Sequence, residues 1–317
     1  MDRRKFIGQS AFIASLPFFQ PVKDLLLTGK LNRIGVQLFS LPKMLDINFE
    51  AAITMLAEMG YKEAELFGPY PFSTASTQAR WNNMAPALGL KGSGFFGRSI
   101  QQVREVFTKN DMSIPSLHTD IDTLQHEMGK LAEAAKALGS QYVTLPAIPE
   151  EYRKSLDDYK KTAGLFNKIG AAAKAEGIRF AYHNHGYGFK ETDGKIPVRV
   201  LLDNTDPALV FLEMDVFWTS AGGADPVSYL NDYSGRYKLM HLKDMSKKMR
   251  FSGDGNNSKE WIELFPYMTT AGNGVLKLDE IVAVAQKTGV DHFIVEQDLV
   301  AEPEVALKKS FGFLHSL

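Results

Sequence analysis

Four stretches of the chain share one form, an apolar run that ends in a side chain able to bind a metal ion. The first, 180–185, ends in His183 and His185; residues two apart in a strand face the same side, so both imidazoles can point into one space. The other three, 211–215, 238–244 and 293–298, end in acids or in a histidine followed by a lysine. We expect these four ends to meet around one divalent metal ion.

Polar residues end most of the predicted strands, and their types indicate the kind of ion. They are Gln37, Glu65, His118, His183, His185, Glu213, Asp215, His241, Lys243, Glu296 and Asp298. A single histidine at a strand end is usually structural, but acids and histidines that end four consecutive strands are harder to explain in that way. Buried charges are costly unless they are paired or bound to a metal. Mixed nitrogen and oxygen ligands favour manganese, cobalt, zinc, iron or magnesium over calcium, and manganese is our preferred expectation.

Eight short apolar runs alternate with amphipathic helical stretches and would position these side chains. The predicted strands are 33–39, 63–67, 113–118, 141–145, 178–183, 209–215, 237–242 and 292–296. Strands that are continuously apolar belong to parallel sheets covered on both faces, and eight β/α units fit a (β/α)8 TIM barrel. A doubly wound sheet is the alternative, but the segment 39–43 after the first strand has no glycine-rich phosphate loop. We therefore predict an α/β barrel as a single domain over residues 31–317.

Two long segments, 68–98 and 244–275, show no clear period and are predicted as irregular loops. The first contains several aromatic residues, which is compatible with a lid over a site or with a surface excursion that packs on itself.

Composition excludes several classes of protein. The 317 residues are 44% hydrophobic and 23% charged, and the net charge of −1 gives no reason to expect a nucleic-acid or anionic-membrane partner. Cysteine is absent, which excludes disulfides, thiolate zinc sites and a cysteine nucleophile. Any metal must therefore use histidines and carboxylates.

The N-terminal segment 1–30 is similar to a twin-arginine export signal, because Arg3 and Arg4 precede a weakly hydrophobic run from Ile7 to Phe19. That run is too short and too interrupted to span a bilayer. The pattern predicts a periplasmic protein that is exported already folded; the alternative is a basic terminus followed by an isolated helix.

The strand-end residues His183, Asp215, His241 and Glu296, with Asp225-Pro226 and the run 241–244, resemble the xylose-isomerase-like TIM barrel superfamily over residues 32–317. The run 182–185 resembles a subgroup often labelled sugar phosphate isomerase/epimerase. The resemblance implies that Asp215, His241 and Glu296 bind the metal, with a fourth ligand from the end of the fifth strand. Ketose epimerases have a glutamate there and pair it with the glutamate of the eighth strand; this chain has His183. It also has Trp218 where many relatives carry a histidine.

The other candidate residues receive roles from their place beside these ligands. His185 is our candidate base, with the alternative that it orients a ligand, and Lys243 would stabilise an alkoxide unless it pairs with Asp215 or Asp244. Glu296 would be both ligand and catalytic residue, and Glu213 would accept a hydrogen bond from a histidine ligand. The predicted substrate-binding residues are Gln37, Glu65, His118 and Trp218.

The resemblance implies a sugar isomerase or epimerase that acts on an unphosphorylated sugar or keto-sugar, by proton abstraction α to a carbonyl through a metal-stabilised enediolate. A 3-keto-glycoside lyase or hydratase, which would lose a β substituent from the same site, is the alternative. A nuclease would need a basic groove and more metal ligands, and a non-catalytic sugar-binding barrel is the remaining class. The expected partner is a small sugar, with no nucleic acid, and a homo-oligomer is compatible with the sequence.

Overall fold

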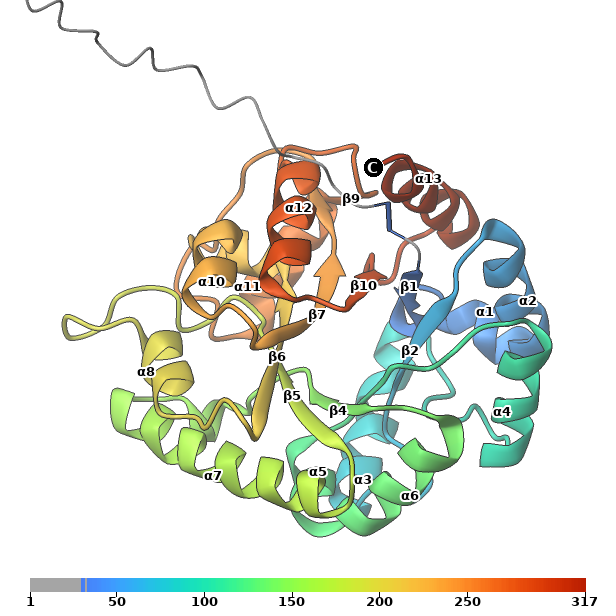
Figure 1. The fold of residues 1–317 in the computed structure, drawn as a ribbon, viewed down its shortest axis with the longest axis horizontal. Helices are drawn as coiled ribbons and strands as arrows, with labels where there is room; N and C mark the ends of the chain where they lie inside the picture. The colour runs from blue at the N-terminus through green and yellow to red at the C-terminus, as the bar shows by residue number, and fades with distance from the viewer. Residues whose placement is uncertain (1–29, 32) are drawn as a thin grey trace, which may run out of the picture.

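Eight parallel strands close into a barrel in the order β1-β10-β7-β6-β5-β4-β3-β2, within the residues 30, 31 and 33–317 that the computed structural model describes. Figure 1 shows the strands at the centre with the helices around them. The strands are β1 (Ile34–Gln37), β2 (Glu63–Phe67), β3 (Ser116–His118), β4 (Tyr142–Leu145), β5 (Arg179–His183), β6 (Val210–Asp215), β7 (Tyr237–Leu242) and β10 (His292–Val295). The predicted TIM barrel is confirmed. The predicted signal segment lies almost wholly outside the described residues and stays a prediction.

The helices that cover the outside of the barrel turn an apolar face toward it. In α2 (Phe49–Met59) the buried side chains are Phe49, Ala52, Ile53 and Leu56, which is helical spacing. The side chain of Asn48 caps its first turn, and Gly60 ends it in the left-handed conformation. The other helices are α1 (Pro42–Ile47), α3 (Ala75–Met84), α4 (Ile100–Lys109), α5 (Ile121–His126), α6 (Met128–Leu138), α7 (Leu156–Ala175), α8 (Pro197–Asp203), α9 (Val216–Ala221), α10 (Pro226–Asp232), α11 (Ser258–Leu264), α12 (Leu278–Thr288) and α13 (Pro303–Ser316).

The short elements complete the chain. They are the 3-10 turns η1 (Leu38–Ser40), η2 (Ala85–Leu88), η3 (Glu150–Tyr152) and η4 (Phe265–Tyr267), and the antiparallel pair β8 (Asp244–Met245) and β9 (Met268–Thr269).

The inside of the barrel has an apolar layer with a polar layer above it. A buried cluster of Tyr142, Ala181, Leu239 and Ile294 forms the apolar layer. Residues two positions further along a strand point the same way one layer higher. Above Ala181, Leu239 and Ile294 stand His183, His241 and Glu296 at the carboxyl ends of the strands. This edge is where TIM barrels carry their chemistry.

A register shift between β6 and β7 decides which polar residues face each other. Leu212 pairs with Tyr237, but the next residue, Glu213, pairs with Leu239, so β7 contains one extra residue at this point. Such a bulge changes the direction of the side chains that follow it. After the bulge, Asp215 lies opposite His241.

The two segments predicted as loops contain helices, so the prediction of wholly irregular segments was wrong. Residues 68–98 include α3 and η2, and 244–275 include α11 and η4. In α3 only Thr77 and Trp81 are buried, and α11 has seven residues. Neither helix has enough apolar residues to produce a visible period, because both lie over the mouth of the barrel rather than against its wall.

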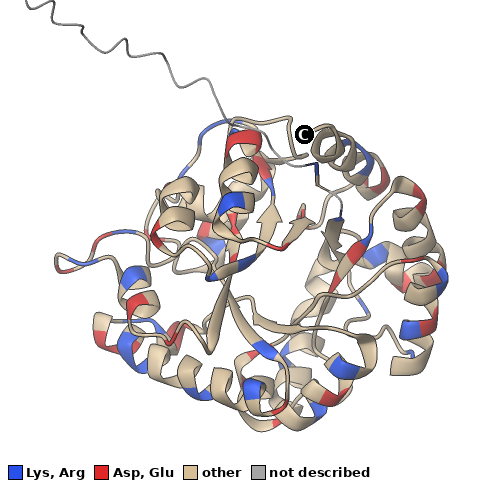
Figure 2. Ribbon diagram, viewed as in Figure 1, with Lys and Arg blue, Asp and Glu red and all other residues tan. Residues whose placement is uncertain are grey.

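Charged side chains of both signs are interspersed on the outer helices, as Figure 2 shows. None of the helices in the described ranges is long and apolar enough to cross a bilayer.

Candidate active site

The four predicted metal-binding side chains converge at the carboxyl end of the barrel. His183 Nε2 lies 3.6 Å from Asp215 Oδ2, and His241 Nδ1 lies 2.8 Å from Glu296 Oε2. The ligand atoms of Asp215, His241 and Glu296 lie within 4.8 Å of one another, and all three residues are buried. Residues more than 100 positions apart in the chain therefore meet at one point, which is the arrangement that the sequence predicts.

Each of the two histidines has one nitrogen directed at the site and the other held by a buried carboxylate. His183 Nδ1 lies 3.0 Å from Glu213 Oε2, and His241 Nε2 lies 2.7 Å from Glu65 Oε2. This carboxylate–histidine arrangement is the one that orients metal-binding imidazoles in proteins. Glu213 thus occupies the place that its predicted role requires, and Glu65 plays the same part for His241.

One nitrogen of this group has no hydrogen-bond partner. His183 Nε2 is buried and unbonded, and it faces Asp215 Oδ2 at 3.6 Å, whose partner is the Lys243 ammonium at 2.9 Å. A buried polar atom without a partner costs about 1–3 kcal/mol, so such atoms need an explanation. A divalent ion held by His183, Asp215, His241 and Glu296 would give His183 Nε2 a partner, and these mixed nitrogen and oxygen ligands suit manganese, zinc or iron. The residues present therefore fit a divalent metal.

A second group, His118, His183, Glu213 and His241, also brings four ligand atoms within 4.8 Å of one another. Its carboxylate atom Glu213 Oε2 is already bonded to His118 Nε2 at 2.7 Å and to His183 Nδ1. Glu296 Oε2 of the first group is likewise bonded, to His241 Nδ1 and Lys243 Nζ, but Glu296 lines the cavity and Glu213 does not, so the first group is the candidate metal site.

Lys243 lies among the same carboxylates and is buried. Its Nζ lies 2.9 Å from Asp215 Oδ2, 2.5 Å from Glu296 Oε2 and 2.8 Å from Asp298 Oδ2. Of the two predicted arrangements for Lys243, the structure contains the ion pair with Asp215. Asp298 was not assigned a role from the sequence; the signal was its position two residues after Glu296, which puts both on one face.

Charges below the metal group are balanced. Burial opposes the protonation of His118, but the carboxylates of Glu65 and Glu213 raise its pKa to about 9. Burial likewise opposes protonation of His241, and Glu213 and Glu296 raise its pKa well above the ordinary value. Below the metal group, the imidazolium ions of His118 and His241 thus face the two carboxylates of Glu65 and Glu213. A metal at His241 must displace the proton on Nδ1, so metal binding releases a proton.

His185 reaches the cavity and, like its neighbour His183, has a pKa below the ordinary value of histidine. Burial is the main cause that lowers its pKa to about 3, and Lys243 lowers it further. Its Nδ1 has no hydrogen-bond partner, and its ring centroid lies 4.9 Å from that of His183 and 5.2 Å from Trp261. Gly186 follows with φ +72°, where a Cβ would lie 2.5 Å from the Phe251 ring, so only glycine lets the chain turn here. The imidazole of His185 is therefore neutral, and its surroundings make it a weaker base than a free histidine.

The four predicted substrate-binding residues fall into two groups. Gln37, His118 and Trp218 line a cavity of about 740 Å³ at the barrel mouth, together with His183, His185, Glu296 and Asp298. Glu65 does not line it, because it lies below, fully buried, where its Oε2 accepts a hydrogen bond from Gln37 Nε2 at 2.7 Å and contacts His118 at 2.9 Å. Glu65 is therefore placed to support the site rather than to contact a ligand.

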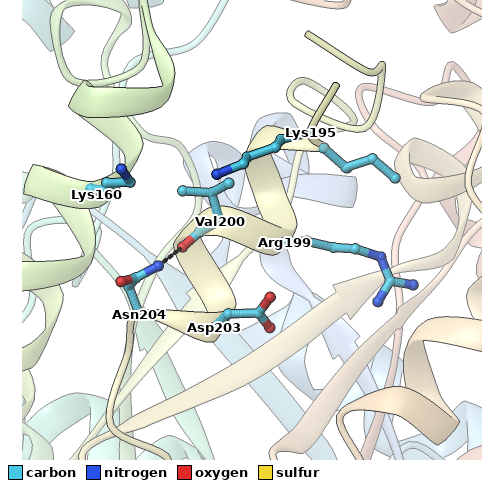
Figure 3. A pocket seen from close by; sticks show the side chains of 7 residues that line it. Lys160, Lys195, Arg199, Val200, Asp203 and Asn204 are labelled. Atoms are coloured by element: carbon cyan, nitrogen blue, oxygen red, sulfur yellow. Dashed lines mark hydrogen bonds between the residues drawn. The ribbon is translucent and has the colours of Figure 1, made fainter. Parts of the chain in front are cut away.

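A smaller cavity lies on the outer surface between α7 and α8 (Figure 3). Lys160, Lys195 and Arg199 line it, but the Arg199 guanidinium is paired with Asp232 at 2.6 Å. It has no histidine in its lining and lies away from the strand ends.

Comparisons with known proteins agree with this geometry. A family model described as "Xylose isomerase-like TIM barrel" matches residues 53–317. An inosose dehydratase from Clostridium beijerinckii is 26% identical over 284 residues, which cover 84% of this chain and 86% of that protein. A solved sugar phosphate isomerase/epimerase from Parabacteroides distasonis is 22% identical, with a TM-score of 0.68 over 94% of this chain and 98% of that one. The IolI protein, solved with a bound zinc atom, is 15% identical, with a TM-score of 0.59 over 90% and 95% of the two chains.

Proposed function

The chain belongs to the xylose isomerase-like TIM barrel family, and from this premise we propose that it is a divalent-metal-dependent enzyme that removes the proton α to the carbonyl of an unphosphorylated keto-sugar. The observation that carries the proposal is the buried, unbonded atom His183 Nε2, which faces Asp215 Oδ2 at 3.6 Å beside His241 and Glu296 at the inner end of the cavity. The metal, when bound, acts as a Lewis acid that polarises the carbonyl. Manganese is our preferred ion.

The protein's own groups would carry the proton and the developing charge. His185 is the proposed base, because it lines the cavity and its Nδ1 has no hydrogen-bond partner. The Lys243 ammonium lies behind Glu296 and Asp298, which line the cavity, and would stabilise negative charge that develops beside them. Gln37 and His118 reach the cavity and would bind sugar hydroxyls.

The scarcity of cationic side chains in the lining of the cavity supports an unphosphorylated substrate. Among the described residues that line it, Arg80 is the one arginine and there is no lysine. The Arg80 Nη2 atom already lies 2.8 Å from Asp122 Oδ2. A phosphate group would therefore find no free cationic partner there, and phosphate binding usually depends on one.

Two outcomes can follow proton removal. Reprotonation gives an epimer or isomer, whereas loss of a β substituent gives a lyase or hydratase. Relatives named inosose dehydratase favour elimination, and so does His183, because a glutamate is missing at the strand-five position where ketose epimerases need their second acid/base group. The fold likeness to a sugar phosphate isomerase/epimerase leaves the first outcome as the second candidate.

One experiment separates these outcomes. Manganese-loaded protein is incubated in deuterated water with methyl and phenyl 3-keto-β-glucosides and with free ketoses, and the products are followed by NMR. Deuterium next to the carbonyl with an intact glycosidic bond indicates epimerisation or isomerisation, and release of the aglycone indicates elimination. If neither exchange nor release occurs with any sugar, the proposed activity is wrong.

The variant Lys243→Met tests the relation between the ammonium and the metal. Its Nζ contacts two of the proposed ligands, and a charge at this range is worth a few kcal/mol at an effective dielectric of about 20. We expect manganese affinity to rise about 10- to 100-fold, and turnover to fall. Calorimetric titration of wild type and variant measures the first effect. Unchanged affinity would show that Lys243 and the metal do not compete.

We also propose a periplasmic location, which rests on Arg3 and Arg4. Replacing both by lysine should leave the protein in the cytoplasm of a Gram-negative host, as fractionation would show. Equal periplasmic yield of the variant and the wild type would contradict the twin-arginine route.

A further inference from the structure

The cavity at the barrel mouth has a polar inner end and an apolar outer part. Five of the ionisable side chains that line it lie at the strand ends described above; the others are Arg80, Asp120, Asp122 and Glu151, and of these Arg80 and Asp122 pair with each other at 2.8 Å. Large apolar side chains form the outer walls: Phe39, Phe67, Trp81, Met84, Leu88, Trp261, Ile262, Phe265 and Leu299. Sugar hydroxyl groups need hydrogen-bond partners, which such walls do not offer. A sugar at the inner end would therefore leave the outer walls without a matching partner.

The outer walls end in two exposed apolar side chains from distant parts of the sequence. Met84, at the end of α3, is 49% exposed, and Ile262 in α11 is 61% exposed. They are two of the five large hydrophobic side chains that the described residues expose, and both line this cavity; the other three, Ile47, Val275 and Val305, do not. Exposed apolar groups gathered at one opening mark a binding surface.

Met84 and Ile262 form the two lips of the cavity opening, and packed aromatic side chains lie beneath both lips. Trp81 lies 6.0 Å from Phe67, measured between ring centroids, and Phe67 lies 5.2 Å from Phe39. On the other side Trp261 stacks near Tyr187 at 6.2 Å, and its Nε1 donates a hydrogen bond to the Gly255 carbonyl at 2.7 Å. These contacts fix the walls, so the apolar surface is a formed part of the cavity.

We propose that this outer part binds an apolar, aromatic group joined to the sugar, so that the substrate is a glycoside with a hydrophobic aglycone. The inference rests on the proposed function, because the sugar ring is placed at the metal end. The cavity of about 740 Å³ is of the size that holds drug-sized molecules, for which about 300–1,000 Å³ is usual. Its apolar part is continuous with the polar end, which favours one ligand with two chemically different halves over a separate partner.

Binding measured with a pair of probes tests the proposal. Phenyl β-glucoside and methyl β-glucoside present the same sugar with an aromatic or a minimal aglycone. We expect manganese-loaded protein to bind the phenyl compound about 10- to 100-fold more tightly in calorimetric titration, which corresponds to burial of one phenyl ring. In Met84→Gln and Ile262→Gln this preference should fall several-fold, while affinity for the methyl compound is unchanged. Ile47→Gln, which changes another exposed apolar side chain that lies outside the cavity, is the matched control.

The possible results separate this inference from the proposed activity. Equal affinity for both glucosides, or a preference that Met84→Gln and Ile262→Gln leave intact, overturns the apolar subsite even if deuterium exchange on 3-keto-glucosides occurs. A phenyl preference that the variants reduce supports the subsite even if no sugar exchanges, and in that case the proposed activity alone is wrong. If instead the two variants convert an oligomer into a monomer without any change in glucoside binding, the lips contact a second copy and the proposal falls.

Discussion

Asp215→Asn should lower turnover about 1,000-fold, because metal-ion catalysis contributes several kcal/mol and about 4 kcal/mol corresponds to that factor. Manganese affinity should fall at least about 100-fold, since even residues that only orient ligands are worth 10- to 100-fold. Asp215 Oδ2 is buried between His183 Nε2 at 3.6 Å and Lys243 Nζ at 2.9 Å, and asparagine replaces its negative charge by a neutral amide. Metal content and turnover of the purified variant measure both effects.

The fold should survive this change. Asp215 Oδ1 accepts a hydrogen bond from the backbone N–H of Trp218 at 2.9 Å and so caps α9. Asparagine can make the same bond. Asp225 caps α10 in the same way, through the N–H of Val227 at 3.2 Å, but it lies outside the site. Asp225→Asn is therefore the matched control and should keep both metal and activity. Wild-type metal affinity in Asp215→Asn would mean that Asp215 is not a ligand.

Glu213→Ala should have the largest effect on stability. Glu213 Oε2 lies 2.7 Å from His118 Nε2 and 3.0 Å from His183 Nδ1, and its Oε1 lies 3.4 Å from His241 Nε2. Without Glu213, the protonated imidazoles of His118 and His241 lose one of the buried carboxylates that balance their charge. Breaking a buried ion pair on one side costs about 3–5 kcal/mol, so we expect the free energy of unfolding to fall by about that amount. Denaturant unfolding in the presence of a chelator measures it without a contribution from bound metal.

The loss should depend on pH with a definite sign. The pKa of His118 is about 9 in the folded protein against 6.5 as its ordinary value, so protonated His118 contributes stability that is fully present below about pH 6.5 and is lost as the pH rises through 9. The deficit of Glu213→Ala should thus be larger at pH 6 than at pH 9. Glu213→Gln keeps the volume and removes the charge, so a similar deficit in both variants assigns the effect to charge. An equal loss at both pH values would exclude this account.

The barrel itself could be predicted from the sequence because its signals are local. Each strand is a short apolar run followed by an amphipathic helix, and the pleat of one strand is enough to place His183 with His185 and Glu213 with Asp215 on common faces. Parallel strands then bring all carboxyl ends to one edge. Residue types at the strand ends thus predicted where polar groups gather and what kind of ion they could hold.

Contacts between strands could not be predicted in this way. The bulge that sets Asp215 opposite His241 depends on how β6 and β7 pair, and nothing local in either strand indicates an extra residue. The position of Lys243 between Asp215, Glu296 and Asp298 depends on the same closure. Glu65 was expected to contact substrate, but the curvature of the barrel places it under His241, where burial and pairing are decided by four strands at once.

The arrangement of side chains around the mouth of the barrel also could not be predicted from the sequence. Helices α3 and α11 lack an apolar period because they lie over an opening, with one side toward a cavity and the other toward water. Met84 and Ile262 are isolated in the sequence, and they become the two lips of one cavity only when the ring of strands closes. The sequence by itself therefore determined the barrel and the chemistry of its strand ends, since periodicity and residue type are local properties. The tertiary structure decided register, charge pairing and the shape of the cavity, because each depends on residues that are far apart in the chain.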